Sequence, residues 1–125
     1  METREVVYRD LSYEVMAAVF EVQNTLGSGF LEKVYENALL VELKGRGILA
    51  EAQKEIQVIY KGVQVGSYYA DLLVNNEIIV ELKSTEAISK THEAQLLNYL
   101  KATGMKLGLL INFGKTRLEH KRFVI

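Results

Sequence analysis

The sequence predicts a single α/β domain in which a mixed sheet is flanked by helices, and three observations lead to this class. Segments whose apolar residues recur with helical spacing are interspersed with runs typical of strands. Turn signals such as Lys61-Gly62 and Asn75-Asn76 separate these segments, so the loops are short. The run LGLLINF at 107–113 is continuously apolar, as expected of a strand buried on both faces. With 125 residues, of which 49% are hydrophobic, the chain can bury one core, so we expect one domain over residues 1–125.

The individual elements follow from periodicity and from residues that begin or end them. Serine, threonine and aspartate can cap a helix start, and glycine is a common helix stop. The expected helices are 10–26, capped by Asp10 or Ser12 and ended by Gly27; about 31–44, closed by Gly45 and Gly47; and a third from Ser89 or Thr91 to Thr103, stopped by Gly104. The expected strands are about 54–60, 64–74, 77–83, 107–113 and, as an edge, 120–125. This order is a core of αβββαβ, preceded by one extra helix and followed by the edge strand.

Composition narrows the class of protein. Charged residues make up 25% of the chain, which is ordinary for a soluble globular protein. Cysteine is absent, so neither a disulfide scaffold nor a thiolate metal site is expected. The apolar runs are too short to span a bilayer and the N-terminus does not resemble a signal peptide, so we expect a cytoplasmic protein without membrane contact. The net charge of −1 provides no global positive field for nucleic acid, but it does not argue against a nuclease whose carboxylates are neutralised by metal.

The strongest candidate site lies in the hairpin YYADLLVNNEIIVELK. Glu81 and Lys83 point to one face of their strand, and Asp71 stands on the neighbouring strand. Ionisable groups on apolar strands are costly unless they are paired or bound to metal. Mg²⁺ usually takes one or two carboxylates, which Asp71 and Glu81 can supply, with the backbone carbonyl of Leu82 as a third ligand. Lys83 would then position the attacking water or contact the scissile phosphate.

Two considerations limit this interpretation. An ion pair of Lys83 with Glu81 or Asp71 at the end of the sheet would explain the same residues without chemistry. A two-residue loop at Asn75-Asn76 would also pair Asp71 with Val80 and place the two carboxylates on opposite faces. The site therefore requires a loop with an odd number of residues, such as 74–76 pairing Asp71 with Ile79, or a β-bulge.

The second helix carries two acids on its apolar side. Glu32 and Glu36 fall in one arc with Leu39 and Leu43, where a solvated surface pair is not expected. Both acids can simply benefit from the positive end of the helix dipole, by ~0.3–1 kcal/mol. The functional alternative is that Glu32 reaches the metal site at the end of the hairpin.

Two polar residues on the third helix complete the candidate set. Gln95 and Tyr99 are four residues apart and can contact a phosphate or hold a catalytic group, or they can belong to the core. His92 is more typical of a capping residue than of a ligand. The basic run near the C-terminus can touch a DNA backbone or protect an edge strand with charge, and it comprises Lys115, Arg117, His120, Lys121 and Arg122.

These motifs together resemble a known family. Residues 29–35 read G-x-x-E-x-x-Y, and the chain is similar to the small bacterial GxxExxY proteins of the PD-(D/E)XK nuclease superfamily. The resemblance covers about residues 10–113 and implies a restriction-endonuclease-like fold. It further implies that Asp71 and Glu81 bind metal, that Lys83 is the catalytic lysine, and that Glu32 completes the acidic site. Gln95 and Tyr99 would line the site, like the QxxxY motif of RecB-type nucleases. One departure is Ala70, which stands where the superfamily's name has proline.

The leading hypothesis is a Mg²⁺-dependent nuclease, with Mn²⁺ as a substitute and DNA as the favoured substrate. The alternative is a nuclease-like module that binds nucleic acid or a partner protein without cutting. Small size and the lack of a broad basic surface favour the alternative, whereas the intact Asp71, Glu81 and Lys83 favour the enzyme. A structural oligomerisation domain has little support beyond a few aromatic residues, and a homodimer is one option for assembly.

Overall fold

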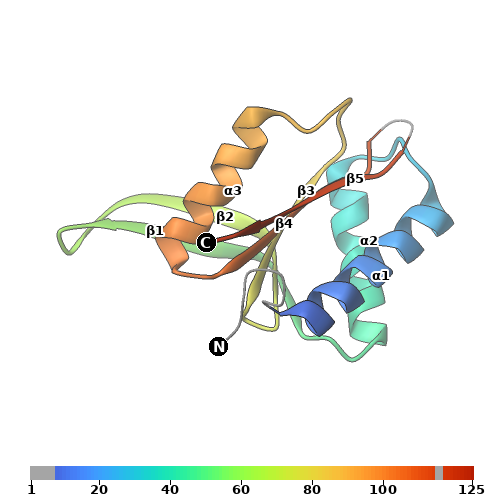
Figure 1. Cartoon of the computed structure of the whole chain (residues 1–125), viewed down its shortest axis with the longest axis horizontal. Helices are drawn as coiled ribbons and strands as arrows, with labels where there is room; N and C mark the ends of the chain where they lie inside the picture. The colour runs from blue at the N-terminus through green and yellow to red at the C-terminus, as the bar shows by residue number, and fades with distance from the viewer. Residues whose placement is uncertain (1–7, 115–116) are drawn as a thin grey trace.

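A computed structural model describes residues 8–114 and 117–125, and within them it contains three helices and five strands (Figure 1). The order of elements is the one predicted from the sequence. The elements are α1 (Arg9–Leu26), α2 (Glu32–Gly45), β1 (Ala50–Tyr60), β2 (Val63–Val74), β3 (Ile78–Lys83), α3 (Lys90–Thr103), β4 (Leu107–Asn112) and β5 (Glu119–Val124).

The strands form one mixed sheet in the order β1-β2-β3-β4-β5. Only the β3–β4 pair is parallel, and the other three pairs are antiparallel. A parallel pair needs a long crossover, and α3 provides it between β3 and β4. The predicted mixed α/β class is therefore confirmed, and the arrangement is consistent with a restriction-endonuclease-like fold.

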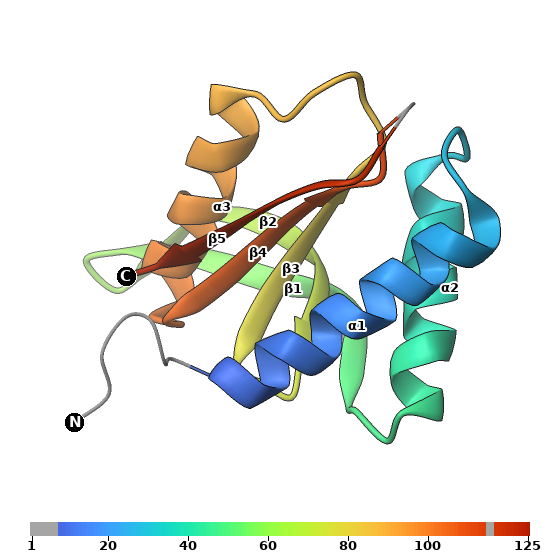
Figure 2. The same ribbon diagram turned by 45° about the vertical axis from the view of Figure 1, so that its right-hand side comes forward.

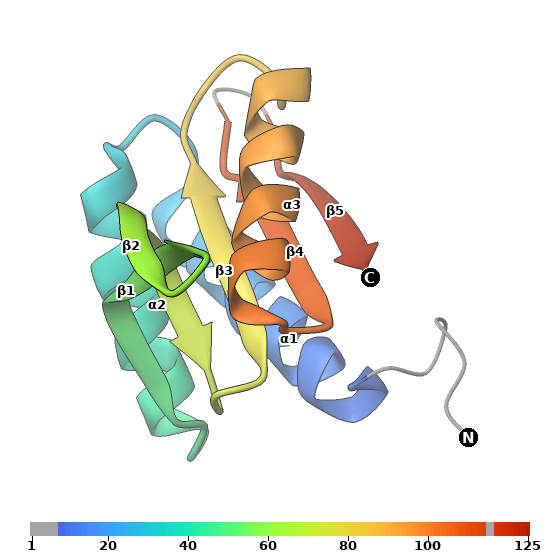
Figure 3. The same ribbon diagram turned by 90° about the vertical axis from the view of Figure 1, so that its left-hand side faces the viewer.

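Helices cover both faces of the sheet and create two apolar layers. Helices α1 and α2 lie on one face and α3 on the other (Figures 2 and 3). The larger buried cluster joins α1 and α2 to the sheet, with Tyr35, Leu39 and Phe113 fully buried in it. The smaller cluster joins α3 to the sheet through Leu96 and Leu100. Burial on both faces explains why β3 and β4 are apolar almost throughout.

Three helix ends agree with the sequence, and one, the start of α1, differs. Ser89 caps α3 as predicted: its hydroxyl accepts from the His92 N–H at 3.2 Å, and its own N–H donates to His92 Nδ1 at 3.1 Å. Gly27 and Gly104 end α1 and α3. The prediction that Asp10 or Ser12 caps α1 is wrong, because the helix already begins at Arg9. Ser12 instead lies inside the first turn and donates to the Arg9 carbonyl at 3.1 Å.

The hairpin of β1 and β2 is longer than the sequence suggested. β1 begins at Ala50, whereas the sequence predicted a start near residue 54. The prediction was too short because residues 50–53 (AEAQ) lack the branched and aromatic side chains that indicate a strand. Figure 1 shows the outer part of this hairpin projecting beyond the body of the molecule. The residues exposed there include Ile59, Tyr60, Val63 and Val65.

None of the helices in the described part of the chain combines the length and the apolar character that a membrane span requires.

Candidate active site

The loop between β2 and β3 sets the register that the site requires. The strands pair Val74 with Ile78 and Leu72 with Val80, so the loop is the three residues 75–77. Its first two residues, Asn75 and Asn76, have φ of 50° and 57°, a left-handed conformation that asparagine tolerates. The odd loop length agrees with the expectation, but the specific pairing of Asp71 with Ile79 is wrong. The loop starts one residue later because Val74 stays in the buried ladder, and Asp71 therefore faces Glu81.

β2 and β3 separate at Asp71, and carboxylates take over the backbone hydrogen bonds. The ladder ends at the pair Leu72–Val80. Beyond it, the Asp71 N–H donates to Glu81 Oε1 at 3.0 Å, and the Leu82 N–H donates to Asp71 Oδ2 at 2.7 Å. We call this junction of Asp71, Glu81 and Leu82 the carboxylate fork. It places two acids against each other, with Glu81 only 4% exposed.

The fork also marks a change in the face that β2 presents. Ala70 and Leu73 pack with the α3 cluster, whereas Leu72 and Val74 pack with the α1 and α2 cluster. Strict alternation would place Ala70 with Leu72, so the strand twists locally at Asp71. The Asp71 side chain lies in a pocket that residues of α2 also line.

The electrostatics of the fork favour a bound cation. Burial and, next to it, the charge of Asp71 raise the pKa of Glu81 to about 8, while the charge of Lys83 acts in the opposite direction. Asp71 and Glu81 supply the one or two carboxylates that Mg²⁺ usually takes, so the donor set fits this ion. The Leu82 N–H points to the β2 edge, and a strand residue directs its carbonyl to the same edge. Within residues 8–114 and 117–125 no three acidic, histidine or cysteine side chains converge, so water would have to complete the coordination.

Lys83 lies next to the fork without being paired to it. It follows Leu82 on β3, and its carbonyl accepts from the Phe113 N–H at 2.9 Å. The side chain is half-buried. In the described part of the chain its ammonium forms neither a hydrogen bond nor an ion pair, and the structural ion pair with Glu81 or Asp71 is therefore not formed.

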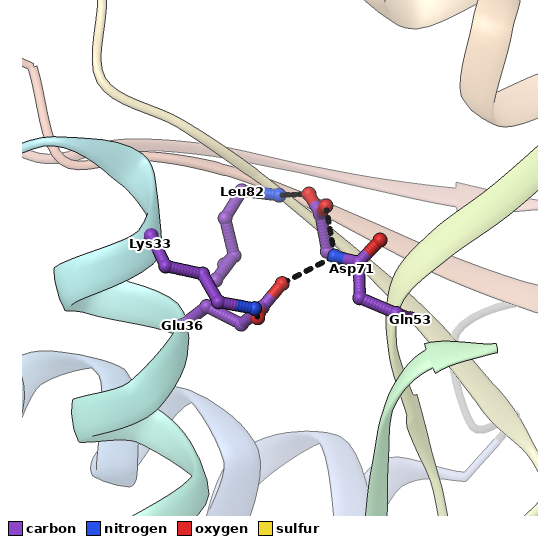
Figure 4. Close-up of polar contacts among 5 residues, drawn as sticks. All are labelled: Lys33, Glu36, Gln53, Asp71 and Leu82. Atoms are coloured by element: carbon purple, nitrogen blue, oxygen red, sulfur yellow. Dashed lines mark hydrogen bonds and ion pairs between the residues drawn. The ribbon is translucent and has the colours of Figure 1, made fainter.

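The two candidate acids of α2, Glu32 and Glu36, occupy different positions. Glu36 is 3% exposed, forms an ion pair with Lys33, and accepts a 2.6 Å hydrogen bond from Gln53 (Figure 4). Glu32 is exposed in the first turn of α2. Together with Glu36 and Asp71 it lines a pocket of about 200 Å³. The acid that reaches toward the fork through a hydrogen bond is therefore Glu36, and a helix dipole alone does not account for it.

Gln53 is a polar residue that the sequence did not reveal. Its Nε2 lies 2.6 Å from Glu36 Oε1 and 3.5 Å from Asp71 Oδ1. It was missed because the expected strand began at residue 54.

The two candidate residues of α3, Tyr99 and Gln95, differ in burial and in contacts. Tyr99 is 5% exposed, its ring lies 5.7 Å from that of Tyr68, and burial together with the charges of Glu81 and Asp71 raises its pKa to about 12. Tyr99 is therefore near the fork as well as part of the core. Gln95 is half-buried and has no hydrogen bond among the described residues.

The basic run near the C-terminus is partly neutralised. Lys121 forms a 2.7 Å ion pair with Glu93 on α3, and Arg122 donates to the Ser12 hydroxyl at 3.0 Å. Lys115 lies outside the described residues. The part of the run on β5 therefore serves the edge of the sheet at least as much as it offers free charge.

Comparison with known families agrees with the fold. Residues 9–123 match the family model described as the PD-(D/E)XK nuclease superfamily. This chain belongs to the PD-(D/E)XK nuclease superfamily. The narrower resemblance to GxxExxY proteins stays a prediction.

Comparison with individual proteins adds support for the fold alone. The crystal structure of SSO0001 matches with a TM-score of 0.54 and 22% sequence identity. The match covers 97% of this chain and 61% of the other, so this chain spans less than two thirds of that protein. A search of curated proteins found no match.

Proposed function

We propose that this chain is a divalent-metal-dependent nuclease that hydrolyses phosphodiester bonds in DNA. The observation that carries the proposal is the carboxylate fork: two acids, one of them buried with a raised pKa, meet where the sheet opens. Membership of a nuclease superfamily supports the reaction class. Cytoplasmic location and the choice of DNA over RNA are expectations from the sequence.

The residues of the fork have distinct roles in this proposal. Asp71 and Glu81 hold Mg²⁺, or Mn²⁺ in its place, together with the Leu82 carbonyl. Such an ion supplies charge stabilisation at the phosphate and a more acidic bound water. Because the Lys83 ammonium has no partner among the described residues, it is available to orient the attacking water or to contact the scissile phosphate.

The remaining candidates lie around the fork. Glu32 stands at the rim of the pocket, where it completes the acidic surface facing the substrate. Tyr99 and Gln95 come from α3, and the charges of Glu81 and Asp71 act on the Tyr99 hydroxyl. We assign both α3 residues to the wall of the site.

A module that binds without cutting is the second candidate. The exposed apolar residues of the outer β1–β2 hairpin favour it, since such surface often marks an interaction site. In this case the fork would be a vestige of catalysis. A homodimer is one arrangement that would cover this surface.

Cleavage assays with a matched pair of variants separate the candidates. Wild-type protein in Mn²⁺ should cut plasmid, linear duplex or single-stranded DNA, and Asp71→Asn should not. Asp10→Asn removes an exposed acid on α1 and should cut like wild type, which controls for contaminating nucleases and for the loss of one charge. If wild type cuts none of these substrates, or Asp71→Asn cuts equally well, the enzymatic proposal fails.

A further inference from the structure

Gln53 has a backbone conformation that its residue type does not favour. Its φ is 53°, in the left-handed region that glycine and asparagine enter far more readily than glutamine. The β1–β2 ladder pairs Ala52 with Leu72 and Lys54 with Ala70, but it omits the pair between them, Gln53 and Asp71. Such strained residues persist where surrounding contacts hold them, and they concentrate at functional sites.

The side chain of Gln53 shows what this conformation achieves. Its amide group is directed to α2 and lies between two carboxylates, Glu36 and Asp71 (Figure 4). An amide NH₂ has two hydrogens, so one can go to each acid. The bond to Glu36 is short at 2.6 Å and the one to Asp71 is long at 3.5 Å.

Glu36 is a firm anchor for this amide. It is buried, it is held by the ion pair with Lys33, and it belongs to a helix packed against the sheet. Asp71 receives the Leu82 N–H on Oδ2 and the Gln53 amide on Oδ1, so both of its oxygens have a donor. The orientation of this carboxylate is thereby defined from β3 and from Gln53 of β1, which in turn is bonded to Glu36 of α2.

We propose that Gln53 is a positioning residue of the metal centre: anchored on Glu36, it orients the Asp71 carboxylate. This inference rests on the proposed function, since it gives Asp71 a metal to bind. Residues that orient a ligand typically change metal affinity 10–100-fold when they are removed. Gln53 touches neither the metal nor the substrate in this role.

Substitutions at Gln53 can distinguish the effect of its left-handed backbone from the effect of its side-chain amide. Gln53→Gly accepts the left-handed φ without strain but has no amide, and Gln53→Asn tolerates this φ but carries its amide on a shorter side chain. Lys61→Gly is the matched control, because Lys61 also has a positive φ (49°) and lies in the turn of the outer hairpin. The readouts are the Kd for Mn²⁺ by titration calorimetry, without DNA, and the melting temperature.

We expect both Gln53 variants to bind Mn²⁺ roughly 10–100-fold more weakly than wild type. Gln53→Gly should nonetheless melt no lower than wild type, whereas Lys61→Gly should keep wild-type affinity. Equal Mn²⁺ affinity of wild type and both Gln53 variants would overturn the role of Gln53 alone. A wild type that binds no Mn²⁺ at all would overturn the proposed function as well, so the two failures are distinguishable.

Discussion

Burial beside Asp71 holds the pKa of Glu81 at about 8, compared with 4.5 for an ordinary glutamate, and this difference makes stability depend on pH. Between these two values the folded protein binds more protons at this site than the unfolded chain, so the free energy of unfolding falls as pH rises. One pKa unit corresponds to about 1.4 kcal/mol, so from pH 5 to pH 8 the loss from this carboxyl is on the order of 3 kcal/mol. Urea denaturation in EDTA across this range measures it.

Two variants identify the titrating group. Glu81→Gln keeps an acceptor for the Asp71 N–H but cannot ionise, so its stability should vary much less between pH 5 and pH 8. Glu51→Gln removes an exposed acid of β1 and should keep the wild-type slope. A wild-type slope retained by Glu81→Gln would show that another group is responsible.

Lys83 is expected to affect rate and not stability. Since its ammonium is unpaired among the described residues, Lys83→Met should change the free energy of unfolding by only about 0.5 kcal/mol or less and leave Mn²⁺ binding intact, while cleavage is lost. Breaking a buried ion pair would instead cost ~3–5 kcal/mol. Urea denaturation and a plasmid assay measure the two effects, with the exposed Lys101→Met as control. A strongly destabilised Lys83→Met would contradict the catalytic role.

The sequence predicts the acidic residues of the site more readily than the polar residues that contact them. The meeting of Asp71 and Glu81 could be predicted only on the condition of a loop with an odd number of residues, because the two-residue period of strands otherwise places them on opposite faces. Gln53 could not, because its left-handed backbone breaks that period and its partner Glu36 comes from a helix 17 residues away. The inward position of Glu36 instead of Glu32 depends on how α2 is rotated against the sheet, which tertiary packing decides.

The close contact between α3 and β4 depends on Gly108, where a larger side chain should destabilise the fold. A Cβ on Gly108 would lie 2.8 Å from Leu96 Cδ1, and Leu96 is fully buried. Gly108→Ala should therefore destabilise the fold by about 1–3 kcal/mol through overpacking. Urea denaturation at pH 7 measures the change.

Gly66 on β2 provides the matched control. A Cβ there would meet Val58 at 3.6 Å, an ordinary contact, so Gly66→Ala should be neutral or slightly stabilising. Similar stabilities for the two variants would mean that α3 packs less closely on β4 than the structure has it.

Helices and strands were predictable where the spacing of apolar residues agrees with the residues that begin or end an element. The capping residue Ser89 and the stop Gly104 bound α3, and the apolar run of β4 identified a strand covered on both faces. The start of β1 was not predictable, since residues 50–53 have no strand-forming side chains and residues 50–52 are held in the sheet by pairing with β2. Tertiary pairing overrode local preference there.

For the whole molecule, metal and folding should be coupled. An ion that binds only the folded state stabilises it by ~2.7 kcal/mol at a hundredfold excess over its Kd, which corresponds to roughly 10 °C for a domain of this size. Thermal melts with Mn²⁺ and with EDTA measure this shift. Asp71→Asn should lose most of it and Asp10→Asn should retain it, and an equal shift in both variants would place the metal elsewhere.

The central claim is that Asp71 and Glu81 bind one divalent cation where β2 and β3 separate. A crystal soaked in Mn²⁺ tests it most directly through the anomalous signal of the metal. We predict a peak between these two carboxylates, with the Leu82 carbonyl on the same side. A soaked crystal without a peak at this position, or with the two side chains on opposite faces of the sheet, would contradict the claim.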